Sequence, residues 1–367
     1  MMERKWENIS QWLKQEGVEM AIVHSTPNVF YLTRFLCDPH ERLMGVFLFP
    51  EADPFLVCPN MEQARARAAG WTEQIIGYDD AEDPWLMIGE ALRKRGIERN
   101  ASIAVEKESL PYARAEALLG VVPGASFTAV DALINQMRLV KSADELAILR
   151  QAALIADEAV QVGLDALGLG RTELEVVAEI ELAMKKKGIR EMSFPTTILF
   201  GANSALPHGT PGDRPLKKGD FVLFDLGVVL DGYCSDITRT FVYQEASEEQ
   251  RAIYDAVLTA QEAAINACRP GVRMGDVDLA ARNLISERGY GEYFNHRLGH
   301  GLGIGVHEFP SIHERNDDPL LTGMVFTIEP GIYVPEVGGV RIEDDVHITA
   351  DGVELLTRFP KTFQIID

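Results

Sequence analysis

Residues 221–243, with the sequence FVLFDLGVVLDGYCSDITRTFVY, constrain the fold of this chain more than any other segment. Two β-prone runs meet there at Asp231-Gly232, a dipeptide that strongly favours a two-residue hairpin turn. A tight turn at this point places Leu230 opposite Tyr233 and so fixes the register of both strands. The segment therefore predicts an antiparallel β-ribbon.

That register brings two aspartates onto one face of the ribbon. Counting back from the turn puts Asp225 opposite Thr238 and Gly227 opposite Asp236, which makes Asp225 and Asp236 diagonal neighbours about 7–8 Å apart at the backbone. Two like charges among apolar strand residues repel each other unless their face is wet or a cation lies between them. Taken alone, the pair fits a polar edge strand as well as a metal site.

Two further segments place carboxylates on strands that we expect to be half buried. GMVFTIEPGIYV, residues 323–334, ends an apolar run at Glu329, just before a Pro-Gly break. GGVRIEDDVHIT, residues 338–349, alternates aliphatic and polar residues, so Arg341 and Glu343 project from one face. A single arginine offsets only one carboxylate charge, and this shifts the balance toward a metal site.

A third segment, NHRLGHGLGIGVHEFP at residues 295–310, is rich in histidine and glycine. His296 and His300 are four residues apart, the spacing of a zinc-binding helix, but glycines at this density oppose a regular helix. We interpret the glycines as letting the chain pass close to a crowded centre.

Adding one imidazole to the carboxylates gives an oxygen-rich set of candidate metal ligands: Asp225, Asp236, His300, Glu329 and Glu343. Two divalent cations would balance the four negative charges of this set when the histidine is neutral. The donor types favour Mn²⁺, with Co²⁺ or Zn²⁺ as alternatives.

The composition restricts the class of protein. The chain has 367 residues, enough for two domains, and a formal net charge of −21, which argues against nucleic acid or an anionic membrane surface as its partner. Four scattered cysteines without a CxxC pair suit a reducing cytosol. No signal peptide and no run of about 18 apolar residues is recognisable. We therefore expect a cytoplasmic protein.

Hydrophobic periodicity predicts a smaller α/β domain at residues 1–131 and a second, larger domain at residues 132–367. In the first domain, apolar runs predict strands within 18–25, 45–50, 54–59, 102–106 and 126–130, and helical patterns occur near 60–69, 84–95 and 111–119. In the second, the pairs Ser142/Glu145 and Thr172/Glu175 are capping boxes that predict two long helices. Strands follow, with further helices near 247–268 and 275–289.

Five short blocks in this order resemble the pita-bread metallopeptidases, a family that includes prolidase, aminopeptidase P and methionine aminopeptidase, with creatinase as a metal-free relative. The blocks are ALPHG, FDLG…SDITRT, HRLGHGLGIGVHE, TIEPGIY and VRIEDD, between residues 205 and 345. The resemblance implies an α+β chain, in which a pita-bread catalytic domain follows a smaller creatinase/prolidase-type α/β domain. All five candidate ligand positions are intact, unlike those of creatinase, and the large N-terminal domain weighs against methionine aminopeptidase.

Roles for individual residues follow from the resemblance. It implies that the five candidate ligands bind two metal ions, with Glu343 as a bridge and Glu329 also moving a proton. His208 and His307 match the family's substrate-contacting and proton-handling histidines, while His296 and Arg341 match residues that line the substrate pocket. Without the resemblance, these histidines would be interpreted as satisfied polar loop residues.

The loop RFLCDPHERLM adds candidates from the N-terminal domain. In bacterial prolidases, which the chain resembles, this domain reaches toward the active site of a dimer partner. The resemblance thus implies a homodimer in which Asp38 and His40, with Arg42, close the site or bind a dipeptide terminus, although a solvated charged loop is the alternative. Arg297 is a further candidate for binding the substrate carboxylate.

We predict a Xaa-Pro dipeptidase, in which a metal-bridging hydroxide hydrolyses the peptide bond that precedes proline in a small peptide substrate. The proline nitrogen lacks an N–H, so a small shaped pocket suits such substrates better than a strand-like grip. The alternatives are a Xaa-Pro aminopeptidase that acts on longer peptides and a peptide-binding protein without turnover.

Overall fold

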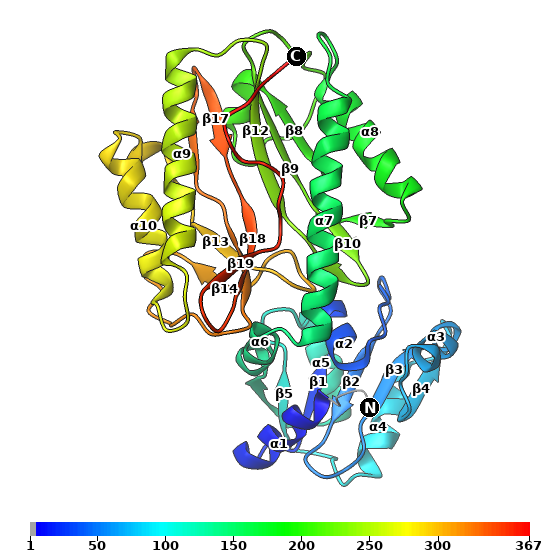
Figure 1. Cartoon of the computed structure of the whole chain (residues 1–367). Coiled ribbons are helices and arrows are strands. Elements are labelled where there is room, and N and C mark those ends of the chain that lie inside the picture. Colours follow the sequence, from blue (N-terminus) through cyan, green and yellow to red (C-terminus); the bar gives the residue numbers. More distant parts are fainter. Residues whose placement is uncertain (1–4) are drawn as a thin grey trace. The chain divides into compact units, whose positions relative to one another are not determined.

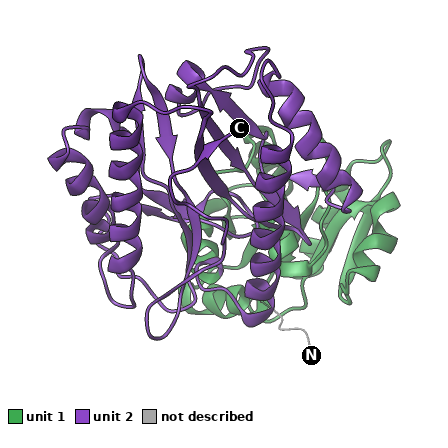
Figure 2. Ribbon diagram, turned by 45° about the horizontal axis from the view of Figure 1, so that its top comes forward, with its two compact units in different colours: residues 1–137 green, residues 138–367 purple. Residues whose placement is uncertain are grey.

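The computed structural model describes residues 5–367, which form two compact units that meet between Met137 and Arg138 (Figure 2). The predicted boundary, after residue 131, lies instead at the start of helix α6 (Asp131–Leu139), which continues through the junction. Within these residues, no helix is both long enough and apolar enough to cross a lipid bilayer.

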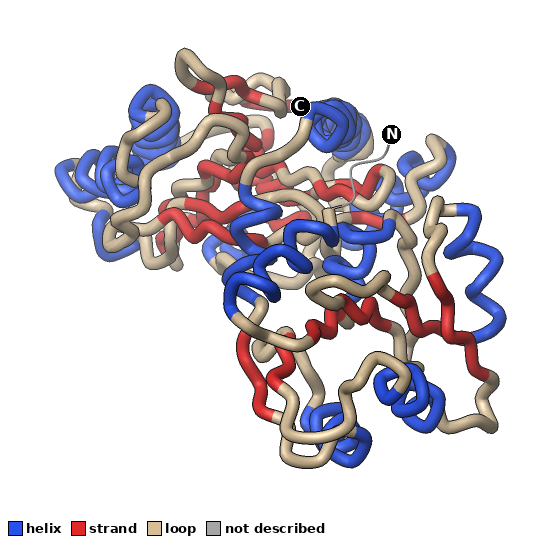
Figure 3. The backbone as a smooth tube through the Cα atoms, turned by 90° about the horizontal axis from the view of Figure 1, so that it is seen from below, coloured by secondary structure: helices blue, strands red, loops and turns tan. Residues whose placement is uncertain are grey.

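The first unit is built on a mixed six-stranded sheet in the order β4-β3-β2-β1-β5-β6, with helices on both faces (Figure 3). Its strands are β1 (Met20–Val23), β2 (Gly45–Leu48), β3 (Phe55–Pro59), β4 (Gln74–Tyr78), β5 (Ser102–Val105) and β6 (Ser126–Ala129). Its helices before α6 are α1 (Trp6–Glu16), α2 (Thr26–Thr33), the 3₁₀ helix η1 (Asn60–Glu62), α3 (Gln63–Ala68), α4 (Pro84–Arg93) and α5 (Tyr112–Val121). The predicted strands and helices are all present, whereas α2 and β4 were not predicted.

The second unit places two helix pairs against strands (Figure 1). Helices α7 (Ala143–Asp165) and α8 (Glu173–Lys186) pack on one apolar cluster, and α9 (Glu248–Ala267) and α10 (Met274–Glu287) pack on another. Both predicted capping boxes are formed, at Ser142 and Thr172. The close approach of α7 to the strands requires a glycine, because a Cβ atom at Gly163 would lie 2.3 Å from the ring of Phe224.

The strands of this unit form several small sheets. The first half contains β7 (Glu191–Met192), β8 (Thr197–Phe200), the 3₁₀ helix η2 (Gly201–Ala205), β9 (Phe221–Leu226), β10 (Val228–Leu230), β11 (Tyr233–Cys234) and β12 (Ile237–Tyr243). The second half contains the 3₁₀ helix η3 (Gly291–Tyr293), β13 (Gly299–Gly301), β14 (Glu308–Ile312), β15 (Val325–Ile328), β16 (Gly331–Val334), β17 (Gly338–Arg341), β18 (Asp344–Ile348), β19 (Val353–Leu355) and β20 (Ile365–Ile366). The helices and sheets together confirm the predicted α+β class.

The predicted hairpin is present with its predicted register. Leu230 pairs with Tyr233 and Asp225 pairs with Thr238. The ribbon nevertheless divides at residues 227 and 235–236, so that β10 and β11 join a sheet with β7 while β9 and β12 join a sheet with β8 and β20. At this division the hydroxyl of Ser235 accepts a hydrogen bond from the backbone N–H of residue 228.

Candidate active site

Asp236 lies where the ribbon divides and is buried. Its backbone N–H donates a hydrogen bond to Asp345 Oδ2 at 3.0 Å, which holds the backbone of Asp236 in place where the ribbon divides. Its own Oδ1 atom is buried and has no hydrogen-bond partner among the described residues. A buried carboxylate oxygen without a partner is energetically costly unless a proton or a cation satisfies it.

His300 lies on β13, a short strand and not a helix, as the glycines indicated. Its Nε2 atom is 3.8 Å from Asp236 Oδ2 and 3.3 Å from Glu329 Oε1. The neighbouring glycine is obligatory, since a Cβ atom at Gly299 would lie 1.9 Å from the backbone oxygen of Thr327. Close approach of β13 to β15 therefore brings the imidazole to the carboxylates.

Glu343 occupies the break between β17 and β18 and is buried. Its Oε2 atom accepts a 2.6 Å hydrogen bond from Thr238 Oγ1, and its backbone N–H donates to Thr238 O at 3.1 Å. Its Oε1 atom, like Asp236 Oδ1, is buried and unpartnered among the described residues. Thr238 thus links the first ribbon to the last carboxylate of the site.

These side chains fit a metal ion. Asp236, His300 and Glu343 each offer a ligand atom, and these atoms all lie within 4.8 Å of one another. Two of the three residues carry the unpartnered oxygens described above, and oxygen donors with one imidazole suit divalent first-row ions. The site contains the residue types, the burial and the unsatisfied oxygens that a cation requires.

Burial changes the proton affinities of these groups. It raises the pKa values of Asp236 and Glu343 well above their ordinary values, and neighbouring carboxylates raise them further. Burial also raises the pKa of Glu329 to about 7, although Arg341 opposes the shift. The pKa of His300 falls to about 3, mainly through burial, so this imidazole is neutral at pH 7, as a metal ligand must be.

Asp225 is placed close to this group but is engaged by an arginine. Arg341 Nη2 donates to Asp225 Oδ2, while its Nε and Nη1 atoms donate to Thr238 Oγ1 at 3.1 Å and to the Tyr333 hydroxyl at 2.8 Å. Arg341 is buried and makes these contacts from the end of β17. Its charge offsets part of the carboxylate cluster.

Three other predicted histidines lie around the centre. The ring centroid of His307 is 4.0 Å from that of His300, and its side chain is exposed. His296 Nε2 is 3.1 Å from the Tyr333 hydroxyl. His208, which follows η2, is exposed. Burial lowers the pKa values of His296 and His307, and electrostatic repulsion from His208 lowers them further.

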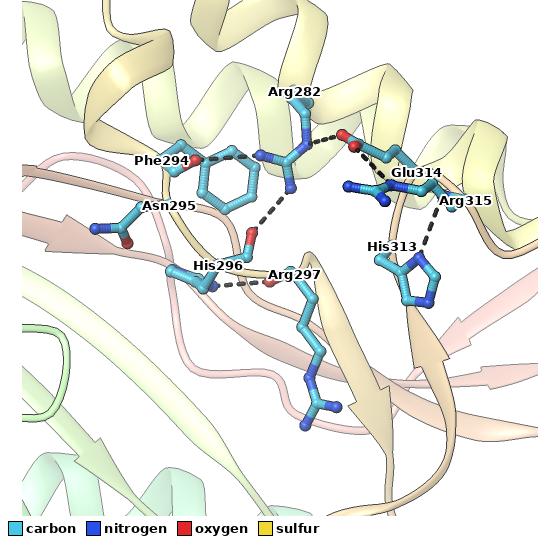
Figure 4. Close-up of a pocket in the computed structure, with 8 residues that line it drawn as sticks. All are labelled: Arg282, Phe294, Asn295, His296, Arg297, His313, Glu314 and Arg315. Atoms are coloured by element: carbon cyan, nitrogen blue, oxygen red, sulfur yellow. Dashed lines mark hydrogen bonds and ion pairs between the residues drawn. The ribbon is translucent and has the colours of Figure 1, made fainter.

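Next to His296 lies a basic cavity of about 370 Å³ (Figure 4). It is lined by Arg282, Phe294, Asn295, His296, Arg297, His313, Glu314 and Arg315. Arg282 is held by Asp278, with bonds of 2.7 and 3.0 Å. Arg297, in contrast, donates a hydrogen bond to the neutral hydroxyl of Ser311 at 3.2 Å. Burial raises the pKa of Glu329, and the charge of Arg297 opposes this shift.

The N-terminal candidates lie in the first unit. Asp38 and His40 are exposed, with His40 Nδ1 3.6 Å from Asp38 Oδ2, and Arg42 donates to Asp80 Oδ1 at 2.7 Å. The backbone N–H of His40 also donates to Asp38 Oδ1 at 2.9 Å, which shapes the turn. A role for Asp38 and His40 in binding substrate stays a prediction.

Several residues of the centre were not predicted. Thr238 and Tyr333 bridge the functional side chains, and Asp345 holds the backbone of Asp236. Thr238 lies opposite Asp225 in the register that the sequence predicted, and this position could have identified it. The contacts of Tyr333 depend on a separate hairpin, β16–β17, so strand alternation alone could not identify them.

Comparisons of this chain with known proteins support the interpretation of these side chains as a metal site. A family model described as metallopeptidase family M24 matches residues 147–350, more than half of the chain, and one described as creatinase/prolidase N-terminal domain matches residues 5–140. A Bacillus subtilis (strain 168) relative, "Putative dipeptidase YkvY", is 57% identical over 98% of this chain and 99% of its own length.

Solved structures are also similar. The prolidase from Pyrococcus horikoshii OT3 is 36% identical with a TM-score of 0.89, over 98% of this chain and 99% of that one. The Xaa-Pro dipeptidase from Bacillus anthracis is 33% identical with a TM-score of 0.91, over 99% of both chains. By its sequence, its two domains and its fold, this chain belongs to metallopeptidase family M24.

Proposed function

We propose that the chain is a dinuclear metallopeptidase that hydrolyses the bond before proline in Xaa-Pro dipeptides. The observation that carries the proposal is the buried group of Asp236, His300 and Glu343, in which two carboxylate oxygens have no hydrogen-bond partner in the part of the chain that the structure describes. Its similarity to a prolidase and to a Xaa-Pro dipeptidase supports the substrate class.

The metal ligands in this proposal are Asp225, Asp236, His300, Glu329 and Glu343. We propose Mn²⁺ as the metal, because oxygen donors outnumber the single imidazole, with Co²⁺ or Zn²⁺ as alternatives. Bound divalent ions supply a nucleophile near neutral pH by lowering the pKa of water, and they polarise the scissile carbonyl.

The chain's own residues position the peptide and move protons. His307, beside His300, donates a hydrogen bond to the oxygen of the scissile carbonyl as negative charge develops there. Glu329 delivers a proton to the leaving proline nitrogen. His208, His296 and Arg341 hold the substrate, and Arg341 also keeps Asp225 oriented through their ion pair.

The basic cavity supports a dipeptide over a longer peptide. A dipeptide presents its terminal carboxylate one residue after the scissile bond. The Arg297 guanidinium, which lines the cavity, donates to the neutral hydroxyl of Ser311. We assign the substrate carboxylate to Arg297, and we propose that Asp38 and His40 of the partner subunit close the site. A Xaa-Pro aminopeptidase would bind longer chains and would have no use for this charge.

Two assays separate these functions. Protein loaded with Mn²⁺ should cleave a Xaa-Pro dipeptide and leave a longer peptide with proline second intact. Cleavage of the longer peptide alone would indicate an aminopeptidase, and cleavage of neither would indicate a binding protein.

A variant tests the carboxylate assignment. Arg297→Gln should raise KM for the dipeptide about tenfold or more, because a charge-assisted hydrogen bond contributes about 1.5–3 kcal/mol. The dipeptide amide, which lacks the terminal charge, should be affected much less. Arg315→Gln, at an exposed arginine of the same cavity, is the control and should leave both substrates unchanged. An equal effect of R297Q on acid and amide would remove Arg297 from this role.

We further propose that the protein is a cytoplasmic homodimer. Its four cysteines are buried free thiols, which agrees with a reducing compartment. Sedimentation of the protein at micromolar concentration tests the dimer.

A further inference from the structure

The segment between β13 and β14 carries His307 and has little rigidity of its own. It contains Gly303 and Gly305, residues that leave the backbone with many accessible conformations. His307, at its end, is exposed, yet its ring lies 4.0 Å from that of His300, centroid to centroid, with the two ring planes tilted by 57°. Something outside the segment must therefore fix the direction of this side chain.

Glu308 provides such an anchor. Its side chain is only 7% exposed, and it faces two cations: Arg138 Nη2 donates to Oε1, and Lys141 Nζ lies 3.4 Å from Oε2. The same Oε1 atom accepts a 2.8 Å hydrogen bond from the backbone N–H of Gly305. Burial raises the pKa of Glu308, but the two cations outweigh it and the net shift is downward. The carboxylate thus joins the glycine-rich segment to the start of the second unit.

The backbone of the segment packs directly on this carboxylate. A Cβ atom at Gly303 would lie 2.7 Å from Glu308 Oε2 and 2.9 Å from Oε1. On the other side, the backbone N–H of Cys234 donates to Gly303 O at 2.7 Å. The segment is therefore held between the ribbon and the Glu308 carboxylate.

The direction of His307 follows from this anchor. Successive side chains at the start of a strand point to opposite sides. Glu308 opens β14 and its side chain contacts Arg138 and Lys141, while the ring of the preceding residue, His307, lies beside that of His300. Because the two residues are consecutive, a backbone that is released at Glu308 no longer fixes the direction of His307.

We propose that Glu308, held by Lys141 and Arg138, is a positioning residue that fixes His307 for the reaction. This inference rests on the proposed function, because it takes His307 to contact the scissile carbonyl. Glu308 itself touches no substrate.

A double-mutant cycle tests the coupling of the two residues. Glu308→Gln removes the charge and should lower kcat for the Xaa-Pro dipeptide about 10- to 100-fold, the range expected when a catalytic group is misplaced by about 1 Å. KM and bound Mn²⁺ should not change. In a His307→Ala background the same change should lower kcat less than about twofold, because the group that it positions is gone.

Two further variants complete the test. Gly303→Ala displaces the flexible end of Glu308 without removing a charge, so it should reproduce the loss of kcat even if E308Q does not fold. Glu354→Gln is the control: it removes a different ion pair, with Arg150, and should leave kcat unchanged.

The outcomes separate the two proposals. If E308Q or G303A lowers kcat by the same factor with and without His307, or has no effect on kcat, the positioning role is wrong and the proposed function stands. If H307A keeps the full kcat, the role proposed for His307 at the scissile carbonyl is wrong, and the positioning role of Glu308 falls with it. If the wild-type protein cleaves no Xaa-Pro dipeptide, the proposed function itself is wrong.

Discussion

At the scale of single residues, Asp236 is the most sensitive point of the proposed site. Its Oδ1 atom is buried without a hydrogen-bond partner in residues 5–367, so we expect Asp236→Ala to remove a metal ligand and to abolish turnover. Metal content measured after dialysis should fall together with activity. Asp220→Ala removes an aspartate that pairs with Arg214 at 2.8 Å in the same unit, and it should keep both. Near-normal rates of D236A in added Mn²⁺ would exclude Asp236 from the centre.

Individual residues also show what sequence patterns can predict. Strand alternation placed Arg341 and Glu343 on one face, and both are buried and bonded to Thr238. It could not predict that Arg341 engages Asp225, because that contact joins residues from two hairpins that lie far apart in the sequence. Long-range ion pairs depend on packing distances that no local pattern contains.

At the scale of elements, the separation of β13 and β15 is set by a glycine. We expect Gly299→Ala to destabilise the protein severely, because the added Cβ atom would meet the backbone oxygen of Thr327, which cannot move without separating the strands. The midpoint of thermal unfolding measures the effect. Gly352→Ala is the matched control, since nothing lies within 4 Å of the added atom. Equal midpoints for the two variants would contradict the close packing of these strands.

The β-ribbon at residues 221–243 shows which features of an element the sequence predicts and which it does not. Asp231-Gly232 predicted the turn and its register, and both residues have positive φ angles, 47° and 83°. The division of the ribbon between two sheets was not predicted, because it depends on the hydroxyl of Ser235 replacing a strand partner. Side-chain hydrogen bonds to the backbone compete with strand pairing in ways that apolar alternation does not reveal.

At the scale of the whole molecule, the carboxylate cluster links stability to pH. A carboxyl group whose pKa is raised on folding binds its proton more tightly in the folded state, so it destabilises the protein as pH rises. Without metal, Glu329 alone should cost on the order of 3 kcal/mol between about pH 4.5 and 7. Asp236 and Glu343 shift in the same direction.

We therefore expect the metal-free protein to lose thermal stability from pH 5 to 7.5, while Mn²⁺ stabilises it increasingly over that range. Calorimetry with and without Mn²⁺ separates this effect from the general repulsion of a chain with a net charge of −21. The midpoint of D236A should not respond to Mn²⁺. A stabilisation by Mn²⁺ that is independent of pH would show that these carboxyl groups are not the ones that bind it.

The distribution of the proposed ligands along the chain affects the protein during its synthesis. Asp225 and Asp236 leave the ribosome before the other proposed ligands, whereas Glu343, which follows β17, is the last of the five. A nascent chain without Glu343 lacks one of the three side chains that converge on the metal site. Domains fold as units during synthesis, so hydrolytic activity can appear only after Glu343 has been added to the chain. A ribosome-bound chain that lacks Glu343 therefore has no peptidase activity toward neighbouring nascent chains.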